Sequence, residues 1–300
     1  MSNAETSGEQ GGHGAVRLEL DAQAALGECP RWSVRDQVLY WVDISEQTLN
    51  RFDPVSGDNS SRVFEEPVAC FSERSKGGFV LAMRNRFALI DHFDAMPRWI
   101  GEGVVVPDGG RFNDGRCDQV GRFLAGTIDF KGSSGALHRI NAKGVIERLA
   151  GDVRSANGLA FSPDGRTMYW SDTRNLIVRC WDYDSESGEI SHTRTFTEFK
   201  SKGGRPDGAS VDTQGCYWSA LYDGGRVVRF APDGKVVEMV TIPSINATMI
   251  AFGGSDMRTA FVTTARQQLS DEQLRSHPHS GGIFSFRVPV PGIPEPYFAG

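Results

Sequence analysis

Short apolar triplets recur along the chain, each just after a turn of glycine and polar residues. They are Leu-Tyr-Trp at 39–41, Phe-Val-Leu at 79–81, Phe-Leu-Ala at 123–125, Met-Tyr-Trp at 168–170 and Cys-Tyr-Trp at 216–218, with a weaker copy, Ala-Phe-Val, at 260–262. Further segments, such as 176–183 and 226–230, nearly alternate apolar and polar residues, which is typical of half-buried strands. The pattern predicts a chain built almost entirely of β-strands.

The repeat unit opens eight residues before each turn. The opening residues are Glu28, Cys70, Asn113, Asn157, Asp207 and, in the weaker copy, Thr248, so successive units are 42, 43, 44, 50 and 41 residues apart. A period in the forties with strands inside every unit is typical of a β-propeller. We therefore predict an all-β fold, a six-bladed β-propeller that forms one domain over residues 15–300.

The two ends of the chain bear on how the ring closes. Residues 15–20 alternate as a strand but precede the first repeat, whereas the last unit ends with apolar segments at 283–288 and 296–298. We expect 15–20 to pair with strands from this C-terminal end and close the ring, because an open ring would expose sheet edges. The one good candidate for a helical turn is 269–275, with Ser270 as its cap. The polar, glycine-rich residues 1–14 predict a disordered tail.

Composition limits the partners. With a net charge of -6 and no basic patch, nucleic acid is not an expected partner. There is no apolar run long enough to cross a membrane, and the first fourteen residues lack the apolar core of a signal peptide. Five cysteines without CxxC spacing indicate reduced thiols in a cytoplasmic protein. The alternative that two of them form a disulfide is left open. We expect a monomer or a weak homo-oligomer.

The repeat starts also predict a functional site. Innermost strands of a propeller line its central channel, so Glu28, Asn113, Asn157 and Asp207 are expected to meet there. Their carboxylate and carboxamide oxygens suit a hard divalent cation, Ca²⁺, Mg²⁺ or Mn²⁺. Zn²⁺ usually takes His or Cys, but it stays open where carboxylates dominate. The alternative is that these polar residues solvate a water-filled channel or cap turns.

Arg111 lies two residues before Asn113 and so on the same face of an extended segment. A guanidinium beside a metal in a cleft suits an anionic or oxygen-rich ligand. The alternative is an ion pair with a carboxylate at the rim. No GxSxG, P-loop or HExxH motif is present, so other common hydrolytic or nucleotide chemistries find no support.

Seven stretches together resemble the SMP-30/gluconolactonase/luciferin-regenerating (regucalcin-like) family. They are LGECPRW (26–32), GGRFNDGRCD (109–118), GRFLAGT (121–127), ANGLAFS (156–162), RPDGASVD (205–212), YDGGRVVR (222–229) and GGIFS (281–285). The resemblance implies a six-bladed propeller with one divalent metal in the channel, held by Glu28, Asn157 and Asp207. It implies substrate contacts from Arg111 and Asn113, and hydrolysis of sugar-acid lactones with Ca²⁺, or else Zn²⁺, as the metal.

One segment departs from the family pattern. Some members carry a pair of Glu shortly after the AlaGlyThr motif, one of which helps to hold substrate, whereas this chain reads IDFKGS at 128–133. Asp129 is the candidate substrate contact there, and Lys131 would favour a more acidic substrate. The family's sugar preference is therefore not carried over.

These observations predict metal-dependent hydrolysis of a sugar-acid lactone to the aldonic acid. Asp207 is the first candidate for the general base, and Glu28 is the second. Two alternatives remain on the same site. One is a metal-dependent phosphotriesterase or aryl esterase, against which the absence of His at the repeat starts counts. The other is a non-enzymatic calcium-binding propeller. The particular sugar lactone, its stereochemistry and the physiological metal stay undetermined.

Overall fold

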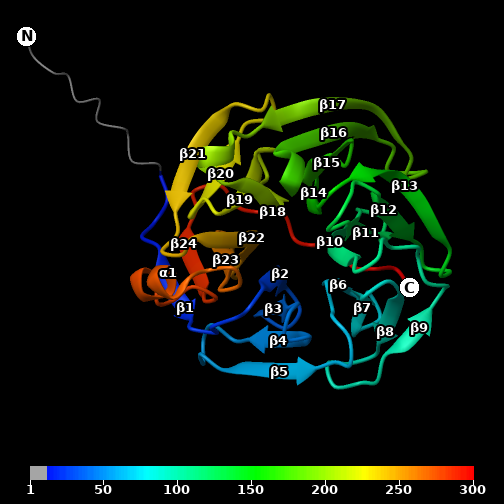
Figure 1. Cartoon of the computed structure of the whole chain (residues 1–300). Coiled ribbons are helices and arrows are strands. Elements are labelled where there is room, and N and C mark those ends of the chain that lie inside the picture. Colours follow the sequence, from blue (N-terminus) through cyan, green and yellow to red (C-terminus); the bar gives the residue numbers. More distant parts are fainter. Residues whose placement is uncertain (1–11) are drawn as a thin grey trace, which may run out of the picture.

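The structure, a computed structural model, describes residues 12–300 and contains six four-stranded antiparallel sheets arranged as a ring (Figure 1). From the centre outward, the sheets are β2 (Gly27–Ser33), β3 (Val38–Asp43), β4 (Thr48–Phe52) and β5 (Asn59–Val63); β6 (Cys70–Glu73), β7 (Phe79–Ala82), β8 (Phe87–Ile90) and β9 (Arg98–Ile100); β10 (Arg111–Cys117), β11 (Phe123–Ile128), β12 (Gly135–Ile140) and β13 (Ile146–Val153); β14 (Ala156–Phe161), β15 (Thr167–Asp172), β16 (Ile177–Tyr183) and β17 (Ile190–Glu198); β18 (Arg205–Val211), β19 (Tyr217–Tyr222), β20 (Arg226–Phe230) and β21 (Val236–Thr241); and β22 (Asn246–Gly253), β23 (Thr259–Ala265), β24 (Ile283–Arg287) and β1 (Arg17–Leu20). The predicted six-bladed propeller is confirmed.

Burial follows strand position within each blade. The two inner strands are almost wholly buried, as in β2 and β3, whereas outer strands such as β5 and β9 are largely exposed. The recurring apolar triplets fall on the second strand of each blade, apart from Cys216, which lies just before β19. Both faces of this second strand pack against neighbouring blades. A strand buried on both faces reads as a continuous apolar run, which explains why the triplets signalled the repeat.

The sixth sheet joins the two ends of the chain. β1 pairs antiparallel with β24, with Arg17 opposite Ser285 and Leu18 opposite Phe284, as predicted. This pairing closes the ring and covers an edge that would otherwise be open. Contact begins before residue 15, because Gly14 N donates to Arg287 O at 2.8 Å. Of the predicted tail, residues 1–11 lie outside the described residues.

The predicted helical turn is present as α1 (Asp271–Ser276), between β23 and β24. Ser270 Oγ accepts from Gln273 N at 3.3 Å, and Gln273 Oε1 accepts from Ser270 N at 2.8 Å, which is a capping box. Two short 3₁₀ segments, η1 (Thr173–Asn175) and η2 (Ser201–Gly203), complete the structure. No helix of residues 12–300 has the length and apolar character to cross a membrane. All five cysteines are buried and free.

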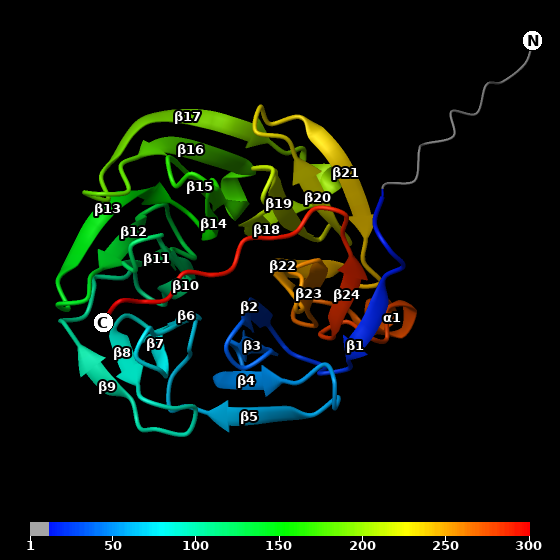
Figure 2. The same cartoon turned by 180° about the vertical axis from the view of Figure 1, so that it is seen from behind.

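The last residues cross one face of the ring. Figure 2 shows this C-terminal strap, residues 289–300, passing over the centre from the sixth blade towards the second. Gly292 bridges to Asp212, and Phe298 N donates to Glu73 O at 2.8 Å. Asp212 and Glu73 lie at the C-terminal ends of the innermost strands β18 and β6, whereas the repeat starts lie towards the opposite ends of these strands. The strap therefore closes one end of the channel. The expectation that 296–298 belong to the last blade is therefore wrong, since Phe298 lies against the second blade.

Candidate active site

Irregular pairing of the innermost strands sets the direction of the site residues. In β2, β10, β14, β18 and β22 the register shifts within two or three residues of the repeat start, as between Glu28 and Arg31 or between Asn157 and Ala160. Such bulges re-aim side chains and end regular pairing. β6 pairs without a shift from Cys70 onwards. The bulges therefore occur in the blades with polar openers, and the Cys70 blade lacks one.

Backbone conformation after two openers supports this interpretation. Cys29 follows Glu28 with φ 47°, and Gly158 follows Asn157 with φ 57°. Glycine adopts positive φ without cost, whereas a residue with a Cβ loses roughly 1–2 kcal/mol there. The strained Cys29 is held by its buried surroundings, and the strain lies directly beside a candidate functional carboxylate.

One pocket at the open end of the channel collects five of the six predicted site residues. Glu28, Arg111, Asn113, Asn157 and Asp207 all line it. The remaining lining is Leu26, Ile128, Phe130, Ser155, Thr173, Arg174, Arg205, Tyr222, Gln267 and Gln268. The convergence expected from the repeat is therefore present, while the individual roles stay predictions.

A chain of hydrogen bonds orders the polar side of the pocket. Arg111 Nη1 donates to Asn113 Oδ1 at 2.6 Å, and Asn113 Nδ2 donates to Asn157 Oδ1 at 2.8 Å. Asn157 Nδ2 then donates to Thr173 Oγ1 at 2.8 Å. Arg111 and Asn113 thus act on the same face, as their spacing predicted. Because a carboxamide oxygen has two lone pairs, Asn157 Oδ1 keeps one for a further ligand.

The two carboxylates of the pocket are buried. Glu28 is 7% exposed and Asp207 is 4% exposed. Burial, with Asp114 adding like charge, raises the pKa of Glu28 to about 8. Burial and the nearby Glu28 raise the pKa of Asp207 well above its usual range, while burial lowers the pKa of the neighbouring Arg111 to about 10. An anionic pair in such a site favours a bound cation.

The donor set fits a hard divalent cation. Within residues 12–300 there is no group of three or more His, Cys, Asp and Glu placed to hold a metal. The third donor of the predicted set is instead the amide oxygen of Asn157, beside the carboxylates of Glu28 and Asp207. Oxygen-only donors suit Ca²⁺, Mg²⁺ or Mn²⁺, and they suit Zn²⁺ less well.

Buried groups behind the pocket support the residues that line it. Asp114 Oδ1 accepts from Gly115 N at 2.8 Å, and its Oδ2 accepts from Leu159 N at 3.0 Å. The second of these bonds ties the inner strand of the third blade to that of the fourth. Behind them, Arg31 Nη2 donates to Gly115 O at 2.6 Å. The positions of the site residues thus depend on contacts between blades.

The structure places Asp129 beside the pocket. Its carboxylate accepts from the backbone N of Lys131 (2.9 Å), Gly132 (2.8 Å) and Ser134 (3.0 Å), and from Ser134 Oγ at 2.7 Å. These bonds hold the pKa of Asp129 below its usual range and shape the loop that presents Phe130 to the pocket. Lys131 points to solvent, where its Nζ lies 2.8 Å from Asp108. Neither residue lines the pocket.

Two aspartates that the sequence analysis did not single out hold the backbone just before an innermost strand. Asp43 accepts from Ala25 N and Leu26 N, at 2.7 and 3.1 Å, just before β2. Asp172 accepts from the backbone N of residues 154 and 155, at 3.0 and 3.1 Å, just before β14. A signal existed, because Asp43 follows Glu28 by 15 residues and Asp172 follows Asn157 by 15 residues. The pocket residues Thr173, Arg174, Arg205 and Tyr222 were also missed.

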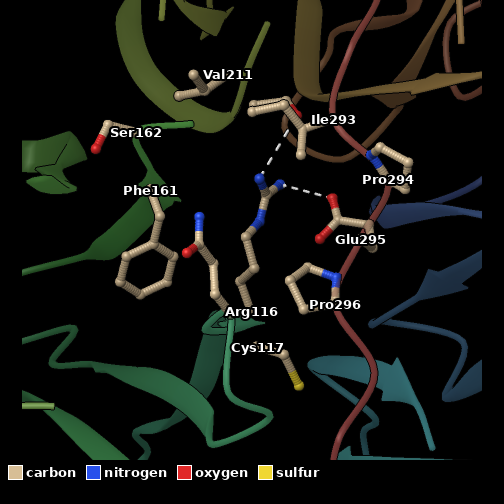
Figure 3. A pocket seen from close by; sticks show the side chains of 11 residues that line it. Arg116, Cys117, Phe161, Ser162, Val211, Ile293, Pro294, Glu295 and Pro296 are labelled. Carbon is tan, nitrogen blue, oxygen red and sulfur yellow. Dashed lines mark hydrogen bonds and ion pairs between the residues drawn. The ribbon is translucent and has the colours of Figure 1, made fainter. Parts of the chain in front are cut away.

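The other end of the channel holds a separate pocket under the strap (Figure 3). Arg116 reaches across it and forms an ion pair with Glu295 at 3.3 Å, while its Nη2 donates to Ala209 O at 2.8 Å. The residues that line it do not overlap those around Glu28 and Asp207. The pocket around Glu28 and Asp207 therefore opens on the face of the ring opposite the strap.

Comparisons with known proteins agree with the fold. The family model described as "SMP-30/Gluconolactonase/LRE-like region" matches residues 26–266. A 6-deoxy-6-sulfogluconolactonase of Pseudomonas putida is 45% identical over 92% of this chain and 96% of its own length. Regucalcin of Xenopus laevis is 34% identical over 92% and 95%. Among solved structures, a calcium-binding protein, regucalcin, from Agrobacterium tumefaciens superimposes with a TM-score of 0.91 at 26% identity, over 96% of this chain and 98% of that one.

Proposed function

The chain belongs to the SMP-30/gluconolactonase/LRE-like family and is a lactonase, a hydrolase that acts on sugar lactones; from this premise we propose that the pocket around Glu28 and Asp207 opens the lactone ring with the help of one divalent metal. The observation that carries the proposal is this pair of buried carboxylates facing one pocket, with Arg111 beside them. Such a pair gives both a cation site and a base.

Glu28, Asn157 and Asp207 would hold the metal, with Ca²⁺ as the first candidate. A solved relative is named as calcium-binding, and the donors are all oxygens; Mg²⁺, Mn²⁺ and Zn²⁺ are the alternatives. When bound, a divalent cation supplies polarisation of the ester carbonyl and lowers the pKa of water.

The chain's own residues supply orientation and proton transfer. Arg111 and Asn113 would hold substrate oxygens, since both present donors to the pocket. Asp207 would take a proton from the attacking water as the new bond to the carbonyl carbon forms. The ring C–O bond then breaks, and the proton passes to the departing ring oxygen, which leaves a hydroxy acid. The raised pKa of Asp207 makes its ionised form a better base. Glu28 is the second candidate for this role.

The substrate is an aldonic-acid lactone in this proposal. The Pseudomonas putida relative is named for a sulfonated gluconolactone, so this lactone belongs in the first panel together with neutral pentono- and hexonolactones. Asp129, whose oxygens are already bonded within its own loop, would act on substrate by positioning Phe130. Since all five thiols are free, we also place the protein in the cytoplasm, as a monomer or a weak homo-oligomer.

The test is metal reconstitution. The protein is stripped with chelator, Ca²⁺, Mn²⁺, Mg²⁺ or Zn²⁺ is added back singly, and acid release from the lactone panel is followed at constant pH. Metal-dependent release above the spontaneous rate is the expected result. If no metal restores release although metal still binds and stabilises the protein, the lactone site is refuted. Phosphotriester and aryl ester substrates would then be tried, before a purely calcium-binding role.

A further inference from the structure

A cleft rich in arginine adjoins the candidate active site. Arg154, Arg174, Leu176 and Arg205 line it, and we call it the arginine cleft. Arg174 and Arg205 also line the pocket that contains Asp207. The two hollows therefore meet at these two side chains, and one ligand could extend from the carboxylates into the arginine cleft.

Three separate elements bring the arginines together. Arg154 precedes β14, Arg174 lies in η1 and Arg205 opens β18. The backbone of Arg154 is fixed at both ends, because its N donates to Asp172 Oδ2 at 3.0 Å and its O accepts from Asp129 N at 2.9 Å. Asp129 and Asp172 thus hold the backbone of this part of the cleft in place.

Aromatic rings and carbonyls set the directions of the other two guanidiniums. Arg174 lies over the ring of Phe130 at 5.4 Å and donates from Nη1 to the carbonyl of the same residue at 2.8 Å. Arg205 lies over the ring of Tyr222 at 5.0 Å. Stacking of this kind orders a guanidinium without neutralising it.

The positive charge of the cleft is mostly uncompensated. Arg205 Nη2 pairs with Asp223 at 2.5 Å, but neither Arg154 nor Arg174 is in an ion pair with any residue between 12 and 300. In addition, Nε of Arg205 is buried and has no hydrogen-bond partner in the described chain. Three guanidiniums with a single ion pair among them leave positive charge and several unused donors, which match an oxyanion.

We propose that the arginine cleft binds a second anionic group of the substrate, a sulfonate or another terminal oxyanion at the end of the lactone remote from its ester carbonyl. This assignment rests on the proposed function, because it places the ester carbonyl at the Glu28 and Asp207 pocket. Arg205 spans the two regions, since its side chain lines both hollows. The cleft makes the enzyme selective for acidic sugar lactones.

The test compares two lactones that differ only at the remote carbon. Metal-loaded wild type, Arg154→Gln, Arg174→Gln and the double variant are assayed with a gluconolactone and with its 6-deoxy-6-sulfo analogue. The ratio of kcat/KM for the sulfonated to the neutral lactone should fall about tenfold in each single variant and about 100-fold in the double, since each lost charge-assisted contact is worth about 1.4 kcal/mol or more. Phosphate and carboxylate analogues then rank the oxyanion.

Arg194→Gln is the matched control, because Arg194 lies on β17 of the same blade and pairs with Asp182 on the surface. An unchanged ratio in the double variant would overturn the assignment, as would equal losses on both lactones. Binding of inorganic sulfate by calorimetry separates this proposal from the proposed function. Sulfate should bind wild type and not the double variant even if no lactone is hydrolysed, and equal binding by both proteins would refute the cleft.

Discussion

Arg116 Nη2 lies 3.3 Å from Glu295 Oε1, and this contact joins the third blade to the C-terminal strap. Arg31 Nη1 approaches the same carboxylate oxygen at 3.7 Å. Both guanidiniums are buried, with side chains 7% and 3% exposed. Glu295, which lies on the strap and outside the repeats, therefore provides a negative charge for two arginines of the innermost strands.

Removing that counter-charge should destabilise the whole ring. We expect Glu295→Ala to lower the free energy of unfolding by about 2–4 kcal/mol, because a buried charge loses its partner. Urea denaturation measures the change. Asp108→Ala is the control, since its pair with Lys131 is exposed and should cost less than about 1 kcal/mol. Equal effects of the two substitutions would show that the strap is not held electrostatically.

Asp207→Ala should abolish turnover and metal binding together, because one carboxylate is assigned both tasks. We expect a loss of at least about 1,000-fold in kcat, in line with the combined loss of an acid–base group and the metal. Calorimetry with Ca²⁺ and the acid-release assay test the two parts. Asp233→Ala in an exposed turn of the same blade is the control. A variant that turns over at the wild-type rate without metal would disprove both roles.

Arg111→Ala should separate substrate binding from metal binding. Its guanidinium donates to Asn113 and lines the pocket, but it is not a metal ligand in our assignment. KM should rise about tenfold or more while the Ca²⁺ affinity stays within a few-fold, because a charged hydrogen bond of about 1.5–3 kcal/mol is lost. Loss of the metal in this variant would mean that the roles are assigned wrongly.

Metal binding should release protons near neutral pH. The pKa of Glu28 is raised from 4.5 to about 8 by burial, so without metal the folded protein keeps this carboxyl protonated at pH 7. A cation needs the ionised form, and its affinity should therefore fall as the pH drops below about 8. Calorimetry in buffers of different ionisation enthalpy counts the protons. Glu28→Gln should reduce this proton release, since Asp207, whose pKa is also raised, supplies the remainder, and a wild type that releases none would contradict the prediction.

Acid stability should depend on His138 in the third blade. Burial lowers the pKa of this histidine from 6.5 to about 4, so between these values the unfolded chain binds the proton and the folded chain does not. Stability should hence rise with pH across this window. We expect about 1–2 kcal/mol between pH 4.5 and 7 from this group, read from urea titrations at several pH values. His138→Gln should flatten the profile, whereas an unchanged slope would refute the assignment.

Part of the site was predictable because it repeats. Glu28, Asn157 and Asp207 each open a unit, and equivalent positions of a closed ring must face the same axis. Asp129 was harder, because its candidacy came from its place in the chain alone. The structure shows its four hydrogen bonds to the following loop, which no pattern of spacing revealed.

The sequence by itself determined the number of blades, the closure by residues 15–20 and the polar residues that meet in the channel. These features follow from local periodicity and from the need to pair every edge strand. Only the tertiary structure decided the course of the strap, the Arg116–Glu295 pair and the arginine cleft of Arg154, Arg174 and Arg205. These depend on contacts between segments of different blades with no common spacing, so their positions exist only once the ring has closed.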